Sequence, residues 1–309
     1  MEKFYTLGFL VLSFSLSTKG HPHSKWHPNT EAVDREEMLA LFRDYMQTYN
    51  RTYKDREEAL HRFKVFVENV KKAKRLQGEE RGTAQYGVTK WSDLSEDELD
   101  SGIFKPDCQS CCQEVHLDDR VQNLPESQDW RKKDSVTPIK NQGESCKACW
   151  AFATVANIES QWAIKNKELI SLSDQEVLDC TNAGNCSEGY IPKAFCNIIN
   201  IGLMKETSYR YSACRNTCRL KENQTVVKIT ACLRLNGSED GMKQYVALNG
   251  TITTLVYLEG LQHYKRGILR SACRKISSRY HALLIIGFGV GMYLGTPSLP
   301  TLLPRPKVS

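Results

Sequence analysis

Apolar and polar residues alternate with helical spacing in three stretches of this chain. The first stretch begins at Glu36 and has one apolar stripe, formed by Met38, Leu41, Phe42, Tyr45 and Met46. In the second, one set of positions is spaced mostly three or four apart: Glu58, Arg62, Val65, Phe66, Asn69, Ala73 and Gln77. The third runs to Lys165 and repeats apolar residues at Ala151, Val155, Ile158, Trp162 and Ile164. Residues three or four apart share one helix face, so the pattern predicts helices over residues 36–77 and after residue 150.

Two later stretches have the character of strands. Residues 251–257 are rich in threonine and other β-branched residues, and residues 281–289 form an apolar run that ends in glycines. Such runs predict strands, the second of them buried. We therefore expect an α+β chain whose second half is rich in strands.

Length and charge restrict the class of protein. The chain has 309 residues, of which 40% are hydrophobic, which allows about two domains. The net charge of +6 is spread along the sequence, without a long basic run interleaved with aromatic residues. The composition therefore argues against nucleic-acid binding.

The first residues predict entry into the secretory pathway. Residues 4–16 are mostly apolar, follow Lys3 and end near small residues, which is typical of a signal peptide (residues 1–20) cut near Gly20. This run is too short to span a bilayer, and no later stretch is long enough. Five Asn-x-Ser/Thr sites are candidates for glycosylation: Asn50, Asn185, Asn223, Asn236 and Asn249. We expect disulfides, and residence in the lysosome, the endoplasmic reticulum or the extracellular space.

Cys149 is a candidate nucleophile. Residues 141–148 have the character of a turn, so Cys149 falls in the first turn of the third predicted helix. Backbone N–H groups and the helix dipole favour a thiolate there. The spacing alone also allows a buried structural cysteine, a Cys146/Cys149 redox pair or half of a zinc site. The only other pair at this spacing is Cys108 with Cys111, in a different kind of segment.

The segment Cys146-Lys147-Ala148-Cys149-Trp150 resembles the active site of papain-like cysteine proteases, the cathepsin family. That family has Cys-Gly-Ser/Ala-Cys-Trp/Tyr, with His and Asn far downstream. Lys147 stands where glycine is usual, and one extra residue separates Gln142 from Cys146. The resemblance implies a papain-like two-domain fold, with a helical left domain and a β-barrel-like right domain, preceded by a helical propeptide. It also implies that Cys149 is the nucleophile and that Gln142 lines the oxyanion hole.

The second predicted helix resembles the propeptides of the cathepsin F and W subgroup. The matching positions are Glu58, Arg62, Phe66, Asn69, Ala73 and Gln77. Residues 87–94 resemble a second propeptide motif, and residues 82–87 resemble cathepsin W. An ordinary amphipathic helix with a Glu58–Arg62 pair is the alternative. The resemblance implies an inhibitor domain over residues 36–100 that occupies the substrate groove, then a linker over 101–123.

The same resemblance implies disulfides and a substrate groove. The pairs would be Cys146–Cys186 and Cys180–Cys218, which leaves no partners assigned to Cys108, Cys111, Cys112, Cys196, Cys214, Cys232 and Cys273. The groove would be lined by Trp150, Glu188, Gly189 and Tyr190. Glu188 replaces a glycine, and it either crowds the substrate, selects basic residues or is a solvated loop carboxylate. Upstream, Ser173 and Glu176 predict a capping box.

His281 is the candidate general base. It opens the buried strand, within the ~130–150 residues that separate Cys and His in this family. His263 lies in a charged segment and is predicted to be an exposed surface residue. The orienting Asn and sheltering Trp of the family are missing, since no Asn follows Asn249 and no Trp follows Trp162.

The resemblance extends over a peptidase domain at residues 124–289. Residues 290–309 form a divergent proline-rich tail, and prolines exclude central strands. We therefore expect an incomplete β domain with an open strand edge beside His281.

The resemblance implies a monomeric cysteine endopeptidase zymogen that acts on proteins or peptides without a cofactor or metal. One alternative is a catalytically impaired isoform that acts as a propeptide-type inhibitor or binding module. A Cys146/Cys149 oxidoreductase is the other.

Overall fold

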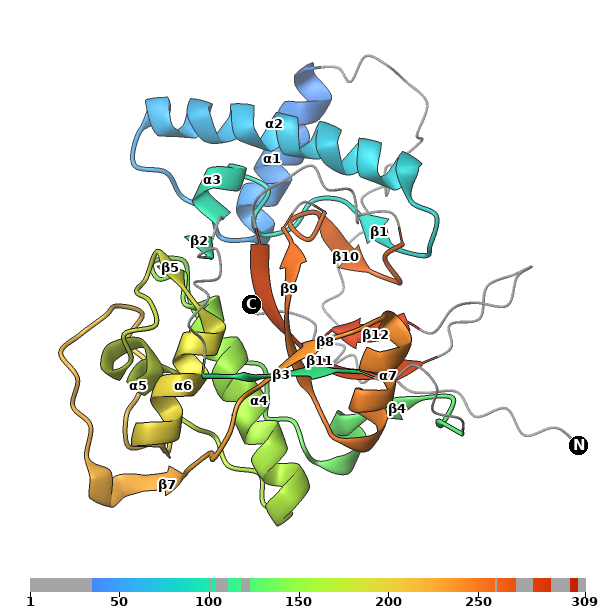
Figure 1. The fold of residues 1–309 in the computed structure, drawn as a ribbon. Helices are drawn as coiled ribbons and strands as arrows, with labels where there is room; N and C mark the ends of the chain where they lie inside the picture. Colours follow the sequence, from blue (N-terminus) through green and yellow to red (C-terminus); the bar gives the residue numbers. More distant parts are fainter. Residues whose placement is uncertain are drawn as a thin grey trace, which may run out of the picture.

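The structure, a computed structural model, describes residues 35–99, 102–103, 111–117, 123–258, 260–270, 280–289 and 301–304. Two helices, α1 (Arg35–Thr48) and α2 (Arg56–Glu79), form a unit that stands above the rest of the molecule (Figure 1). Helix α2 begins where the side chain of Asp55 accepts a hydrogen bond from the Glu58 backbone N–H, at 2.9 Å. The helices predicted over residues 36–77 are confirmed. The predicted signal peptide lies outside the described residues.

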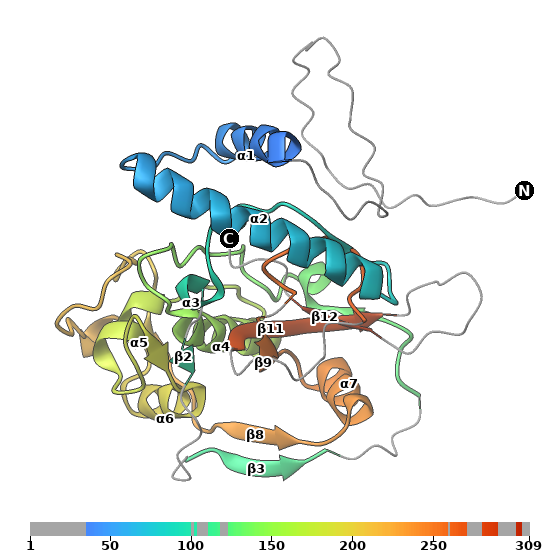
Figure 2. The same ribbon diagram turned by 90° about the horizontal axis from the view of Figure 1, so that it is seen from above.

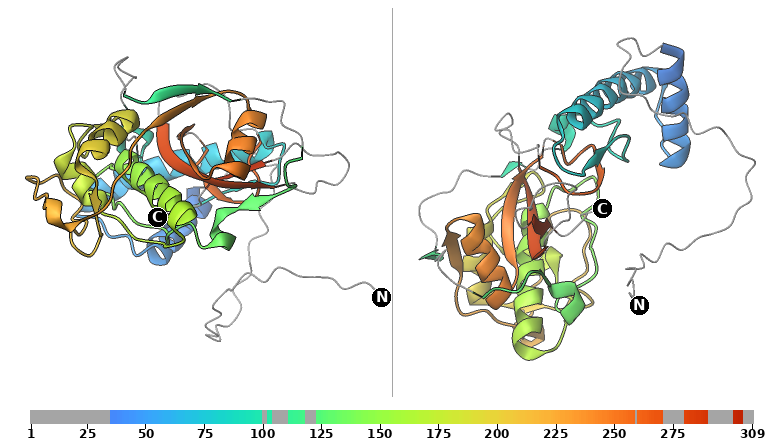
Figure 3. Two further views of the ribbon diagram at one scale, coloured as in Figure 1. Left: turned by 60° about the horizontal axis from the view of Figure 1, so that its bottom comes forward. Right: turned by 90° about the vertical axis from the view of Figure 1, so that its right-hand side faces the viewer.

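The two-helix unit has a core of its own, which is largely aromatic. Its buried members are Met38, Phe42, Tyr45, Phe66 and Val70. The ring of Phe42 stacks on Tyr53 and meets Phe66 at an angle. Figure 3 shows the unit projecting from the body of the protein in the side view. The apolar stripe of α1 therefore packs mainly on α2.

The segment after α2 returns along the remainder of the chain in short pieces. They are β1 (Gln85–Tyr86), α3 (Glu96–Leu99), β2 (Gly102–Ile103) and β3 (Gln113–His116). Strand β1 pairs with β10 (Tyr264–Arg266), β2 with β5 (Glu188–Gly189) and β3 with β8 (Leu233–Asn236). The segment 101–123, predicted to be a linker, thus contributes two strands that pair with later parts of the chain.

The helical half is built around α4 (Cys149–Asn166), which confirms the third predicted helix. Around it lie α5 (Asp174–Cys180), α6 (Ile191–Ile201), β6 (Leu203–Met204), η2 (Glu222–Gln224) and β7 (Thr225–Val227). The short helix η1 (Trp130–Lys133) packs through Trp130 on the β half instead. The first turns of α4 are buried on nearly every side, because α5, α6 and β11 pack on it.

The N-terminus of α5 has only half of the predicted capping box. The Ser173 hydroxyl accepts a hydrogen bond from the Glu176 backbone N–H at 2.9 Å, as a cap should. The Glu176 carboxylate instead accepts from the backbone N–H of Met204, at 2.7 Å. Glu176 therefore joins α5 to β6 rather than closing the box.

The β half is organised by one long strand, β11 (Tyr280–Gly289). Strand β9 (Ile252–Tyr257) and then β4 (Gln128–Asp129) pair with one side of it, and β12 (Thr301–Pro304) pairs with its end on the other side. Helix α7 (Glu239–Leu248) packs against the same strand (Figures 1 and 2). Both predicted strands are confirmed.

The edge of β11 beside His281 is open among the described strands. Because β12 pairs only with residues 285–289, residues 281–284 have β9 on one side and no described strand on the other. The tail predicted to lack central strands contributes β12, which is an edge strand and so tolerates Pro304. In the part of the chain that the structure describes, no helix is long and apolar enough to cross a membrane.

Candidate active site

Cys149 is the first residue of α4, as the sequence predicts, and its side chain is 0% exposed. Ala148 precedes it as the N-cap without a side-chain hydrogen bond, so no side chain competes for the first N–H groups of the helix. The dipole and these N–H groups favour negative charge on the sulfur. Cys149 is not disulfide-bonded.

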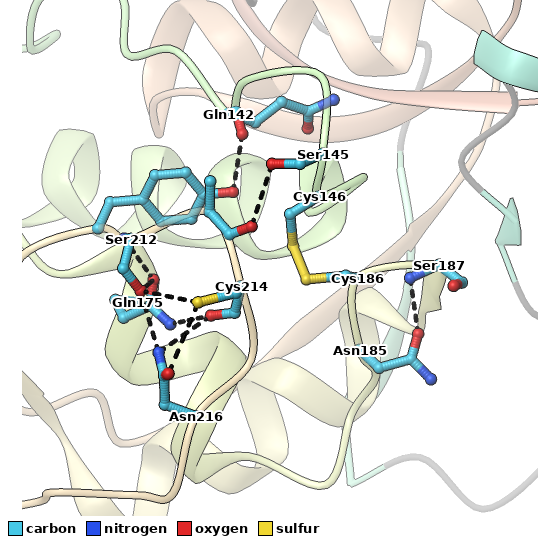
Figure 4. Close-up of a disulfide and its surroundings, with 12 residues drawn as sticks. Gln142, Ser145, Cys146, Gln175, Asn185, Cys186, Ser187, Ser212, Cys214 and Asn216 are labelled. Carbon is cyan, nitrogen blue, oxygen red and sulfur yellow. Dashed lines mark hydrogen bonds between the residues drawn. A yellow bond between two sulfur atoms is a disulfide. The ribbon is translucent and has the colours of Figure 1, made fainter.

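A disulfide between Cys146 and Cys186 holds the turn that leads into α4 (Figure 4). The backbone N–H of Lys147 also donates to the carbonyl of Cys186, at 2.8 Å. This bond leaves Cys146 unable to pair with Cys149, which removes the oxidoreductase alternative. A second disulfide joins Cys180 to Cys218. Both pairs are those expected from the resemblance.

Helix α4, which begins with Cys149, packs against strand β11, which carries His281. His281 is the second residue of β11, lies opposite Val256 and is half-buried. The residue after it, Ala282, packs on Cys149 and Ala153 in a small buried cluster. The candidate nucleophile and the candidate base therefore lie at the junction of the helical and β halves.

Gln142 lies on the same turn as Cys146 (Figure 4). Its backbone carbonyl accepts a hydrogen bond from the Tyr211 hydroxyl at 2.9 Å, which fixes the turn to the helical half. The side-chain oxygen of Gln142 is buried and has no hydrogen-bond partner among the described residues. The fold therefore fixes the backbone of Gln142 beside this turn and leaves its side-chain oxygen without a hydrogen bond among the described residues.

The predicted groove residues form one wall beside α4. The indole N–H of Trp150 donates to the Asn185 carbonyl at 3.1 Å, and Gly189 lies directly against the indole ring. Glu188 is half-buried. The Tyr190 backbone N–H donates to the Ala183 carbonyl on the other side of the loop. In β5, Glu188 and Gly189 pair in parallel with β2, so a strand of the returning segment occupies this wall.

A charged cluster is buried beneath the turn. The Lys140 ammonium contacts Glu159 at 2.7 Å and Asp174 at 2.8 Å, and both carboxylates are at most 1% exposed. Burial raises the pKa of Asp174, against the effect of Lys140. Nearby, burial raises the pKa of Glu176 to about 7, although its bond from Met204 acts in the other direction.

Arg62 on α2 connects the two-helix unit to the returning segment. Its guanidinium donates to Glu98 at 2.7 Å and to the Asp93 carbonyl at 3.1 Å, while Glu58 lies 3.9 Å away on the same helix face. The Glu58–Arg62 pair is therefore part of a larger arrangement, more than an ordinary i,i+4 contact.

Asn69 and Gln77, on the same face of α2, bind backbone rather than side chains. The Asn69 amide donates to the carbonyls of Ser92 and Leu94, at 2.9 and 2.8 Å. Gln77 accepts from the Tyr86 backbone N–H at 3.0 Å. The remaining motif positions, Phe66 and Ala73, are buried. The predicted propeptide motif thus fixes the path of the segment after α2.

That segment docks on residues 260–266. The Thr89 hydroxyl donates to the Gln262 carbonyl at 2.6 Å, and the Gln262 amide donates to the carbonyls of Trp91 and Leu94. Helix α2 and this docked segment together cover the loop before β10.

His263 is 1% exposed in this interface, so the prediction that it is exposed is wrong. Its carbonyl accepts from the Gly87 backbone N–H at 2.9 Å, and neither ring nitrogen has a partner among the described residues. Burial, together with the charge of Lys72, lowers its pKa to about 4. The docked segment is distant in sequence, which is why the local charged pattern misled the prediction.

Two disulfides were not predicted. Cys111 is bonded to Cys196, and Cys112 to Cys232. Of the glycosylation candidates, four are exposed, namely Asn50, Asn223, Asn236 and Asn249, and Asn185 is half-buried with its side-chain oxygen bound to two backbone N–H groups. Cys108 and Cys273 lie outside the described residues.

Comparisons with known proteins show the family to which this chain belongs. Residues 124–297 match the papain family cysteine protease family, and residues 42–99 match the cathepsin propeptide inhibitor domain. The chain is 38% identical to mouse cathepsin F over 82% of its own length and 56% of that protein. It is 34% identical to mouse cathepsin W, over 84% of this chain and 74% of that one. The structure of a recombinant stem bromelain precursor aligns with a TM-score of 0.71 and 32% identity, over 82% of this chain and 83% of that one.

Proposed function

Because this chain belongs to the papain family of cysteine proteases and carries a cathepsin propeptide inhibitor domain, we propose that it is a cysteine endopeptidase made as a zymogen. Cys149 is the nucleophile, His281 the general base and Gln142 an oxyanion-hole residue. The observation that carries the proposal is the packing of Cys149, at the N-terminus of α4, on the residue that follows His281.

The reaction uses the chain's own groups. His281 takes the proton of the Cys149 thiol, and the thiolate attacks the carbonyl carbon of a peptide bond. The Cys149 backbone N–H and the Gln142 amide stabilise the negative oxygen that forms. The imidazolium then protonates the departing amine, and water hydrolyses the thioester that remains.

The returning segment supplies the inhibition. Its strand β2 pairs with Glu188 and Gly189 at the wall where we place the substrate. The motif on α2 holds this segment through Asn69 and Arg62. Substrate therefore reaches Cys149 only after the propeptide domain (residues 36–100) and the strand β2 that follows it have left the peptidase domain (residues 124–289).

One observation favours the second candidate function, an impaired protein acting as an inhibitor or binding module. The sequence has no Asn after Asn249 to orient the imidazole, and the edge of β11 at residues 281–284 is open among the described strands. The two-helix unit has its own core and does not depend on this edge.

Thiol labelling combined with a peptidase assay separates the two. In the zymogen, an alkylating agent should label the exposed Cys214 and spare the buried Cys149. After proteolytic removal of the propeptide, Cys149 should become the more reactive thiol and peptide hydrolysis should appear, while Cys149→Ala stays inactive and the control Cys214→Ala stays active. Labelling of Cys149 without hydrolysis would favour the inhibitor instead.

We place the protein in the secretory pathway, in the lysosome, the endoplasmic reticulum or the extracellular space. Four disulfides among the described residues support an oxidising compartment. Enzymatic removal of N-linked glycans from protein made in animal cells tests this directly, through a fall in mass at the exposed sites.

A further inference from the structure

Two disulfides tie the segment before the peptidase domain to that domain. Cys111 is bonded to Cys196 on α6, and Cys112 to Cys232 just before β8. The bonded residues are 85 and 120 positions apart in the sequence. Neither bond belongs to the set that the family resemblance implies.

The residues after Cys111 and Cys112 pair with the strand that follows Cys232. Strand β3 runs parallel to β8, and the two lie side by side at the edge of the molecule away from α1 and α2 (Figure 2). The Gln113 backbone N–H donates to the Cys232 carbonyl at 2.9 Å, and that of Leu117 to the Asn236 carbonyl at 2.8 Å. An exposed two-stranded ribbon is marginal by itself, so the covalent bonds are what secure it.

We propose that residues 111–117 are a disulfide-anchored strand of the peptidase domain, and that a cut between Leu117 and Leu124 leaves the propeptide covalently attached. Among the described residues no cysteine precedes Cys111, so these two bonds are the only described disulfides that hold the inhibitory helices after such a cut. A cut on the N-terminal side of Cys108, or reduction of the disulfides, releases them.

The anchor has a consequence that rests on the proposed function. A propeptide that remains tethered rebinds as part of the same molecule, at an effective concentration on the order of millimolar. A chain cut after Leu117 therefore stays inhibited. In the reductive route, each disulfide takes two electrons and two protons from a dithiol, which is itself oxidised to a disulfide.

Two matched insertions of a site for a sequence-specific protease test the anchor. One is placed after Leu117, beyond the cysteine pair, and the other after Ile103, before it. In a denaturing gel without reductant, the chain cut after Leu117 should run as one species and separate only when a dithiol is added. The chain cut after Ile103 should separate in both lanes. Separation of the first chain without reductant would overturn the proposal.

A variant without the anchor supplies the activity measurement. It carries Cys111→Ser, Cys112→Ser, Cys196→Ser and Cys232→Ser. Cut after Leu117 and assayed without a disulfide reductant, it should hydrolyse peptide at least about tenfold faster than the anchored chain cut at the same place. Equal rates would refute inhibition by the tethered propeptide. Absence of activity from the chain cut after Ile103 would count against the proposed function and leave the gel result intact.

Peptide mapping of the unmodified chain covers the case in which the serine variant does not fold. A non-reduced tryptic digest should contain one species that joins the peptide of Cys111 and Cys112 to those of Cys196 and Cys232. The sulfurs of Cys111, Cys112 and Cys196 lie within 4.8 Å of one another, close enough to share a metal ion. If all four cysteines are alkylated in unfolded, unreduced protein, they are not in disulfides. Together with stoichiometric zinc in the native protein, that result would overturn the disulfide anchor in favour of a metal site.

Discussion

Gly189 lies so close to Trp150 that a Cβ at position 189 would come within 2.2 Å of the indole ring. Real Cβ atoms do not approach this closely, so the β5 loop or the ring must move. We expect Gly189→Ala to destabilise the peptidase domain by about 1–3 kcal/mol, as overpacking of a core does. Thermal unfolding of the full chain carrying Cys149→Ala, a background chosen because we propose Cys149 as the nucleophile, measures the change.

Gly78 supplies a matched control for that substitution. It lies inside α2 with no atom within 4 Å of a Cβ built there. Gly78→Ala should stabilise the helix by about 0.5–1 kcal/mol, because alanine has the better helix propensity. If the two substitutions shifted stability alike, the contact with Trp150 would be of no consequence.

Asn69→Ala should loosen the returning segment. It removes two hydrogen bonds and leaves the carbonyls of Ser92 and Leu94 without that donor in a buried place, at a cost of about 1–3 kcal/mol. We expect faster amide hydrogen exchange over residues 84–99 and, on the proposed function, peptidase activity in the full-length chain. Glu68→Ala, on the exposed face of the same helix, should change neither.

His263 should make the docking of the propeptide sensitive to acid. Covered, its pKa is about 4; uncovered, it returns towards the ordinary 6.5, so the uncovered state binds a proton that the zymogen does not. The contribution to docking is therefore present above pH 6.5 and is lost as the pH falls to 4, by at most about 3 kcal/mol. Lys72 on α2 adds to this effect, while its ion pair with Glu96 on α3 weakens it.

The test compares the full Cys149→Ala chain with and without His263→Gln. The protection of amides in α2, expressed relative to the exchange rate of an unstructured peptide at the same pH, should fall more between about pH 7 and about pH 4.5 in the chain that keeps His263. If both chains respond to acid equally, other groups control the release.

Glu176 should give the peptidase domain the opposite pH dependence. Its pKa rises from 4.5 to about 7 in the folded domain, so the folded state holds a proton that the unfolded chain has lost. Stability is thus greatest below pH 4.5 for this group and falls as the pH rises to 7, by at most about 3 kcal/mol. Glu176→Gln should reduce the loss of melting temperature between about pH 5 and about pH 8. The exposed control Glu168→Gln should not.

The sequence predicts the structural features that are set by residues close together in the chain, such as helix faces and helix starts. The helical spacing of Phe66, Asn69 and Ala73 places them on one face of α2, and Cys149 begins α4 because a turn precedes an apolar repeat. Such patterns predict which residues face inwards, but they do not predict which groups those residues contact. The carbonyls of Ser92 and Leu94, which Asn69 binds, could not be found that way.

Contacts between distant segments were missed for the same reason. His263 stands among charged residues, and it is buried where helix α2 and residues 87–94 dock on its loop. Cysteine connectivity has many combinations, so Cys111 and Cys112 gave no sign of their partners in the sequence. The parallel pairing of β3 with β8 leaves no local signal either, since neither strand shows a buried face.

The aromatic core between α1 and α2 does not rely on disulfides for its stability, whereas the rest of the described molecule contains four of them. It is held by rings such as Phe42 and Tyr45, and no cysteine occurs in the sequence before Cys108. A reducing environment acts on the four described disulfides, all of which lie after residue 110, and leaves the bonds that hold this aromatic core unchanged. We therefore expect reduction to lower the stability of the later part of the chain more than that of the two-helix unit.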